Sequence, residues 1–191
     1  MSKRQTLLEE IRQCTLCLDE LPLAPRPVLN FAAEANILLV GQAPGIKVHE
    51  TGIPWHDASG ERLRDWLQVS SKIFYDPKKI AIVPMGFCYP GKGKTGDLPP
   101  MKRCAPTWMP PILQQLPKVQ LTLLVGAYAQ KYFLQASFNG LTQTVKDYKK
   151  FLPNYFPLPH PSPRNNIWLK KNPWFEENVL SDLRQIIKAV L

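Results

Sequence analysis

The sequence predicts an α/β fold of three layers, in which helices cover both faces of a central four-stranded parallel sheet. Two observations predict it. Four short apolar runs have the length of buried strands, and stretches with helical spacing of apolar residues separate them. Strands that alternate with helices form parallel sheets, because each crossover helix packs back onto the sheet. The predicted strands are Ile37–Val40, Ile80–Val83, Leu121–Val125 and Asn154–Leu158.

The strand predictions rest on how each apolar run ends. Ile37–Val40 is wholly apolar and is broken at Gly41. Ile80–Val83 is stopped by Pro84, which lacks the N–H that a sheet ladder needs. The run before His160 is less regular, since it contains a proline of its own. Residues 89–100 are rich in proline, glycine and lysine, and this composition predicts a loop.

The helix predictions rest on capping residues and on apolar residues at helical spacing. Ser2 and Gln5 have the spacing of a capping box, which starts a helix that runs to Cys14. Ser59 is the expected N-cap of the next helix. A helix over 107–116 is expected to carry Pro110 and Pro111 in its first turn. Further helices are expected over 127–134 and from Asn172-Pro173 onward, the last with its core face formed by Leu180, Leu183, Ile187 and Val190.

A chain of 191 residues is expected to form a single domain over residues 1–191. Its 45% hydrophobic and 20% charged content is typical of a globular protein. No apolar run approaches the ~20 residues of a membrane span, and the first residues lack the apolar core of a signal peptide. We therefore expect a monomer in the cytoplasm, associated with the nucleoid, where the four cysteines are not expected to form structural disulfides.

The charge of the chain favours a polyanionic partner, with nucleic acid first. The net charge is +9, from 24 Lys and Arg against 15 Asp and Glu. Contacts between such side chains and phosphates release counterions and so favour binding. Basic residues gather between Cys88 and Cys104 and again between Lys146 and Lys171. A solvated basic surface without a partner is the alternative interpretation.

The segment that follows the first strand is the strongest candidate for a site. In open α/β sheets, ligands bind beyond the carboxyl ends of the strands. The turn Gly41–Gly45 and the loop after it hold two of the three histidines, His49 and His56. The third, His160, opens a second unusual stretch, His-Pro-Ser-Pro-Arg-Asn. Exposed loop histidines without a function are the alternative for His49 and His56.

The four cysteines have the spacing of a metal centre. Cys14 and Cys17 are separated by two residues, and Cys88 and Cys104 by fifteen. Two thiolates at the shorter spacing can bind one metal centre. The pattern alone leaves three interpretations open, namely zinc, an iron–sulfur cluster, or unrelated buried thiols that pack as small apolar residues.

Taken together, these features resemble the uracil-DNA glycosylase superfamily, and most closely its iron–sulfur-containing family-four enzymes. Gly41–Gly45 (Gly-Gln-Ala-Pro-Gly) is similar to that family's Gly-Glu-Ala-Pro-Gly motif, and the cysteines are spaced like its cluster ligands. The stretch from His160 to Asn165 resembles the second motif of the single-strand-selective uracil glycosylases. The resemblance covers about residues 5–190, and further matches are Gly52, Pro54-Trp55 and Gly60.

The resemblance implies a monofunctional DNA glycosylase of base excision repair, which flips a deaminated base out of DNA and hydrolyses its N-glycosidic bond. A histidine donor stabilises charge on the departing base, an aromatic ring stacks on that base, and main-chain amides bind its other carbonyl and the water. It implies His160, Gln42, Asp57 and His49 in catalysis; Gly41, Ala43, Gly45, Trp55 and Pro84 at the base; Ser162, Arg164, Asn165, Lys170 and Lys171 on DNA; and Cys14, Cys17, Cys88 and Cys104 on a 4Fe-4S cluster, with zinc as the alternative.

The sequence also departs from the family pattern. Gln42 replaces the glutamate of the first motif, and His49 stands where an aspartate is usual. Ala43 occupies the position of the catalytic aspartate of other uracil glycosylases, as is common in family four, and Asp57 replaces a glycine. The asparagine that reads the uracil edge would fall at or near Pro84, which has no side-chain hydrogen bond to offer.

Two classes of function follow. The first is an enzyme that excises uracil or another deaminated base from DNA. The second is a catalytically weak or inactive member of the superfamily that binds DNA or a nucleobase, and Pro84 and Gln42 motivate it. A ferredoxin-like electron carrier fits neither the cysteine spacing nor the basic charge.

Overall fold

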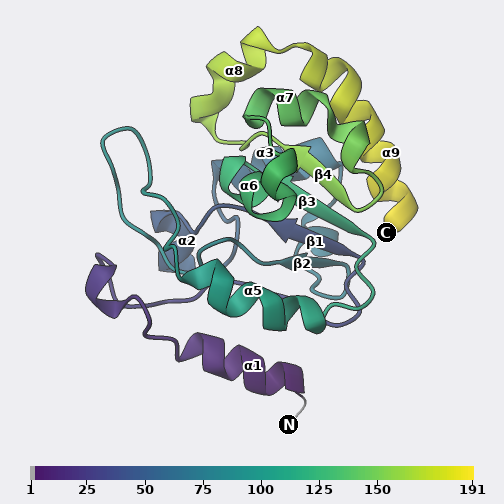
Figure 1. The fold of residues 1–191 in the computed structure, drawn as a ribbon. Helices are drawn as coiled ribbons and strands as arrows, with labels where there is room; N and C mark the ends of the chain where they lie inside the picture. Colours follow the sequence, from purple (N-terminus) through teal and green to yellow (C-terminus); the bar gives the residue numbers. More distant parts are fainter. Residues whose placement is uncertain (1–2) are drawn as a thin grey trace.

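The computed structural model describes residues 3–191 and confirms the predicted fold class (Figure 1). Four strands form one sheet in the order β2-β1-β3-β4, and every pair in it is parallel. The predicted capping box at Ser2 lies outside the described residues. The strands are β1 (Ile37–Val40), β2 (Ile80–Ile82), β3 (Leu121–Val125) and β4 (Tyr155–Leu158).

Helices lie on both sides of this sheet. No helix within residues 3–191 has the length and apolar character that crossing a membrane requires. The α-helices are α1 (Lys3–Arg12), α2 (Ile46–Thr51), α3 (Ala58–Leu67), α4 (Ser71–Phe74), α5 (Cys104–Gln114), α6 (Ala127–Leu134), α7 (Leu141–Lys146), α8 (Asn166–Lys171) and α9 (Leu180–Val190).

The sheet separates two hydrophobic cores. Side chains alternate across a strand, so Ile37 and Leu39 of β1 belong to one core, while Leu38 and Val40 belong to the other. All four are fully buried, which is why the strand has no polar position. The first core is covered by α3 and α9, and the second by α1, α5 and α6.

The start of α3 differs from the prediction. Asp57, not Ser59, is the N-cap, and its Oδ1 accepts a hydrogen bond of 2.8 Å from the backbone N–H of Gly60. Asp57 has the extended backbone of a cap residue (φ −151°). Ser59 lies within the first turn and is buried. Both residue types cap helices well, so composition alone did not separate them.

The segment predicted as a loop after β1 contains a helix, α2, of six residues. It ends at Gly52, which has a left-handed backbone (φ 70°). Arg26 secures this end from another part of the chain, because its Nη1 donates to the carbonyl oxygens of His49 and Glu50 at 2.6 and 2.8 Å. So short a helix shows no apolar period, and no local pattern indicates that Arg26 contacts its end.

The two later helices also differ in their bounds. α5 begins at Cys104, so Pro110 and Pro111 lie inside it and not in its first turn. Each proline removes one helical hydrogen bond. Met109 and Ile112 of the same helix are fully buried in the second core, and that burial offsets the loss. The expected helix from residue 172 is divided into a π-helical turn over 175–179 and α9. Leu180, Leu183 and Ile187 are buried as predicted, while Val190 is partly buried.

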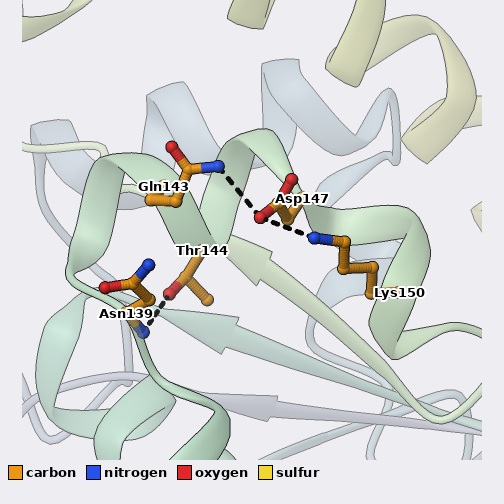
Figure 2. Close-up of polar contacts among 5 residues, drawn as sticks. All are labelled: Asn139, Gln143, Thr144, Asp147 and Lys150. Carbon is orange, nitrogen blue, oxygen red and sulfur yellow. Dashed lines mark hydrogen bonds and ion pairs between the residues drawn. The ribbon is translucent and has the colours of Figure 1, made fainter.

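Polar contacts order the connection that leads from α6 into β4 (Figure 2). The backbone N–H of Asn139 donates to Thr144 Oγ1 at 3.2 Å. Asp147 Oδ2 accepts from Gln143 Nε2 at 2.9 Å and from Lys150 Nζ at 3.1 Å. These contacts tie α7 to the turn after it, which leads into β4 and so to His160.

Candidate active site

A cavity of about 530 Å³ opens at the carboxyl ends of the strands. Its walls are the segment after β1, Pro84 after β2, and the segment after β4. Residues far apart in the sequence therefore converge, as a parallel sheet requires. The cavity brings together these residues predicted for the site: Gly41, Gln42, Ala43, Gly45, Trp55, Asp57, Pro84, His160, Ser162, Arg164 and Asn165.

Three predicted site residues lie outside the cavity walls. The ring of His49 packs against Tyr89, with centroids 6.2 Å apart, and its Nδ1 is buried without a hydrogen-bond partner within residues 3–191. Lys170 and Lys171 are exposed at the end of α8. The geometry therefore separates His49 from His160, and it leaves the two lysines free to meet a partner outside the cavity.

His160 is held as a neutral imidazole with a defined tautomer. Burial lowers its pKa from 6.5 to about 4, although the charge of Asp57 acts in the opposite direction. Its Nδ1 accepts a hydrogen bond from the backbone N–H of Ser162 at 3.2 Å. Because Nδ1 is the acceptor, Nε2 carries the proton. The side chain thus presents a neutral N–H donor in the cavity.

The loop that carries His160 is fixed by its own polar groups. Asn165 Nδ2 donates to the carbonyl oxygen of His160 at 2.7 Å. Ser162 Oγ accepts from the backbone N–H of Arg164 at 3.3 Å, and the carbonyl oxygen of Ser162 accepts from Arg62 Nη1 at 3.2 Å. These contacts hold Ser162 and Arg164 at the cavity wall.

Two features set the position of Trp55, namely its own backbone conformation and the glycine against which its indole packs. Its φ is 57°, in the left-handed region. A Cβ on Gly41 would lie 2.7 Å from Trp55 Cζ2, so only glycine leaves room for the indole there. A Cβ on Gly60 would collide with the Trp55 carbonyl oxygen. The indole therefore packs onto the first residue after β1, next to His160.

Gln42 and Asp57 are both committed to structural contacts. Gln42 Nε2 donates to the carbonyl oxygen of Leu98 at 3.1 Å, and Asp57 Oδ1 caps α3. Pro84 contributes an apolar surface to the cavity. His160, which is partly buried, offers the cavity a neutral donor of defined tautomer.

The hairpin over 91–98 forms a further wall of the cavity, and no motif in the sequence predicts this position. It contributes Thr95, Gly96 and Asp97. A Cβ on Gly96 would meet the guanidinium of Arg164, so the hairpin and the His160 segment are in contact. The composition of residues 89–100 predicts only a loop, and no local pattern indicates which part of the fold such a loop will contact.

The four cysteines line one second pocket, together with apolar side chains. All four are free thiols. Burial raises the pKa of Cys88 to about 11 and that of Cys104 to about 12. Within residues 3–191, no group of three or more His, Cys, Asp or Glu side chains is close enough to hold a metal ion as it stands.

N–H groups donate hydrogen bonds to two of these cysteine sulfur atoms, as is expected where a bound metal keeps the thiols deprotonated. The backbone N–H of Phe87 donates to Cys104 Sγ at 3.4 Å, and that of Arg26 to Cys88 Sγ. Trp108 lines the same pocket, and its Nε1 is buried without a partner within the described chain. Buried thiols without a cation stay protonated and need none of these donors. The chemistry of these donors is therefore that of a metal-binding set, while the side-chain positions within residues 3–191 do not form a metal site.

A comparison with protein families gives a match that covers most of the chain. Residues 29–184 match the family described as the uracil DNA glycosylase superfamily. The matched range includes all four strands and every residue of the cavity except Val28. The parallel sheet, and the cavity at the carboxyl ends of its strands, agree with that match. The chain belongs to the uracil DNA glycosylase superfamily.

Proposed function

We propose that the protein is a monofunctional DNA glycosylase that hydrolyses the N-glycosidic bond of uracil or another deaminated base in DNA. The observation that carries this proposal is the state of His160. Its imidazole is neutral, bears its proton on Nε2 and stands in the cavity beside the indole of Trp55. A flipped base stacked near that indole would have a hydrogen-bond donor at its edge.

The chemistry follows from the charge that develops. As the bond from the sugar carbon C1′ to the base nitrogen breaks, its electron pair moves to the base, and negative charge grows on a carbonyl oxygen. The Nε2–H of His160 donates to that oxygen. A fixed donor in a cavity shielded from water stabilises such charge far more than water does. Main-chain N–H groups of the Gly41–Gly45 turn serve the other carbonyl and the water.

DNA is bound at the rim of the cavity. Ser162, Arg164 and Asn165 contact the backbone next to the flipped nucleotide, and Lys170 and Lys171 extend this surface along α8. Contacts of this kind set position and orientation without reading sequence. The net charge of +9 supports the same partner, and we propose that the protein acts as a monomer.

One observation favours a second function, in which the protein binds DNA or a base with little cleavage. Pro84 lines the cavity where a base-reading side chain is expected, and the amide nitrogen of Gln42 is engaged by Leu98. Discrimination against the wrong base depends on buried polar partners. Loss of such a partner weakens selectivity and not necessarily the hydrolysis itself.

A direct assay separates the two functions. Purified full-length protein is incubated with single- and double-stranded oligonucleotides that carry uracil, hypoxanthine or xanthine, and abasic sites are counted after alkaline cleavage. Excision from at least one of these substrates, with free base as the product, supports the glycosylase. Binding to all of them without release of any base supports the second function.

We also propose that the four cysteines hold a 4Fe-4S cluster, with zinc as the alternative. The proposal is supported by four thiols around one pocket and by the donors from Phe87 and Arg26. Hydrolysis needs no electron transfer, so the group supplies structural cross-linking of segments 14–17, 88 and 104 when bound. Cys88 shortly precedes the hairpin over 91–98, and Cys104 is the first residue of α5.

A further inference from the structure

The hairpin over 91–98 has a defined structure. It belongs to the long loop between β2 and α5, drawn in teal in Figure 1. Lys92 pairs with Asp97 as an antiparallel bridge. The backbone N–H of Leu98 donates to the carbonyl oxygen of Gly91 at 2.8 Å, and that of Gly93 to Gly96 at 2.6 Å. The side chain of Gln42 then anchors the hairpin to the turn after β1, through Leu98.

This anchoring places a second carboxylate at the turn after β1. A Cβ on Gly45 would lie 3.4 Å from Asp97 Oδ2 and 4.0 Å from Asp57 Oδ2. Asp97 and Asp57 therefore stand around the same glycine, and both line the cavity with His160. Two carboxylates thus flank the turn that follows β1.

The two carboxylates are not equivalent. Asp57 Oδ1 accepts from the backbone N–H of Gly60, so this carboxylate is committed to the start of α3. The Asp97 carboxylate makes no hydrogen bond or ion pair with any side chain described in residues 3–191, and it is exposed at the cavity mouth. Asp97 is therefore the carboxylate with both oxygens available to a water molecule.

We propose that Asp97 is a catalytic residue of this cavity, and that its carboxylate binds and deprotonates the attacking water. The inference rests on the proposed glycosylase function and adds a residue to it. Ala43 offers no side-chain base within the first turn after β1, so the base comes from the hairpin. Asp57 instead stabilises the start of α3, next to the cavity.

The step balances as follows. The bond from C1′ to the base nitrogen breaks, and its electron pair leaves with the base. The water oxygen forms a bond to C1′, one water proton passes to the Asp97 carboxylate, and the other remains on the new hydroxyl group. The base anion, stabilised by the His160 donor, takes a proton from solvent, and the protonated Asp97 returns its proton to solvent. Before the water adds, the negative charge of Asp97 also stabilises positive charge on the sugar.

The first test is a single-turnover excision assay on whichever oligonucleotide the wild-type protein cleaves. Asp97→Asn should lower the rate by about a hundredfold or more, the usual loss when a general base is removed. Asparagine suits turns as well as aspartate does, so the hairpin is kept. Asp65→Asn, an exposed position on α3 outside the cavity, makes the same change in net charge and should keep the wild-type rate.

The second test needs no turnover. DNA with a cationic pyrrolidine in place of the sugar imitates the charge at C1′, and DNA with a neutral tetrahydrofuran is its matched control. Wild-type protein should bind the cationic analogue more tightly, and Asp97→Asn should lose that preference while Asp65→Asn retains it. An unchanged preference in Asp97→Asn overturns the inference.

The outcomes distinguish the two proposals. If wild-type protein and Asp97→Asn excise at the same rate, the role of Asp97 is overturned and the glycosylase function stands. If wild-type protein excises no base, both are overturned. A slow Asp97→Asn that has also lost the preference for the cationic analogue supports both.

Discussion

The imidazole of His160 lies beside the indole of Trp55, with ring centroids 5.5 Å apart and ring planes inclined by 31°. The two rings follow strands that are not neighbours in the sheet. Trp55 follows β1, an inner strand, and His160 follows β4, an edge strand. Their contact joins an aromatic surface for a base to a donor for its edge. Five predictions test this arrangement and its surroundings.

Replacement of His160 by alanine should remove most excision activity. Loss of one preorganised donor typically costs about 3–4 kcal/mol in the transition state, or about a hundred- to a thousandfold in rate. DNA affinity and the far-UV circular dichroism spectrum should stay close to wild type. Asp57→Ala and His49→Ala should have smaller effects, and His56→Ala, an exposed position, should have none. Equal rates for wild type and His160→Ala would show that the assignment is wrong.

Gly41→Ala should displace the indole of Trp55. The new Cβ would lie 2.7 Å from Trp55 Cζ2, and a base–aromatic stack is worth about 1–3 kcal/mol. Excision should therefore fall by about tenfold or more. The double variant Gly41→Ala, Trp55→Phe should recover part of this loss, because phenylalanine lacks the indole atoms that the methyl group meets. A double variant slower than Gly41→Ala alone would contradict the steric explanation.

Stability should fall as the pH is lowered through the titration range of His160. Its pKa is about 4 in the folded protein and 6.5 as a free side chain. Between these values the unfolded chain binds a proton that the folded protein does not, so acid favours unfolding. Urea unfolding at pH 7 and pH 5 should show a smaller loss for His160→Asn than for wild type or for His56→Asn. Parallel curves for all three proteins would refute the role of this histidine.

DNA binding should depend steeply on salt, and α8 should contribute to that dependence. Each neutralised phosphate adds about 0.9 to the slope of log K against log salt on duplex DNA. Lys170→Ala with Lys171→Ala should therefore flatten the slope by up to about 2. Lys78→Ala with Lys118→Ala is the matched control, because these exposed lysines precede β2 and β3 at the opposite edge of the sheet. Equal slopes for the two pairs would place the DNA elsewhere.

Protein purified without oxygen should be brown and contain iron and sulfide. Cys88→Ala should lose that metal and unfold at a lower temperature, because the link between the segments at Cys14 and Cys104 is broken. Elemental analysis and thermal unfolding measure the two effects. Zinc in place of iron would select the alternative centre, and absence of both metals from wild-type protein would refute a metal site.

Local sequence determined the strands and the segments that follow them. β1 and β3 match their predicted bounds, and β2 and β4 differ by one residue. A strand buried on both faces must be apolar at every position, and this pattern is visible in a single sequence. Because parallel strands end at one edge of the sheet, it also indicated a site at the segment after β1, whereas Pro84 was implied there only by the resemblance to a known family.

The N-caps and the ends of the helices were determined by the local sequence to a smaller extent than the strands. Asp57 and Ser59 are both good N-caps, and the choice between them depends on which backbone is extended where the chain leaves Trp55. α2 is too short for a helical period to show, and Arg26, which secures its end, is more than twenty residues away. Local propensity is weak beside contacts of this kind.

Tertiary structure alone decided which loops reach the cavity. Nothing in residues 89–100 shows that Asp97 lies beside Gly45, or that Leu98 accepts a hydrogen bond from Gln42. Nor does the sequence show that His49 faces Tyr89 while Val48 lines the cavity. A strand carries its burial in its own residue pattern, whereas a loop is placed by contacts with distant parts of the chain, and those contacts leave no periodic trace in the sequence.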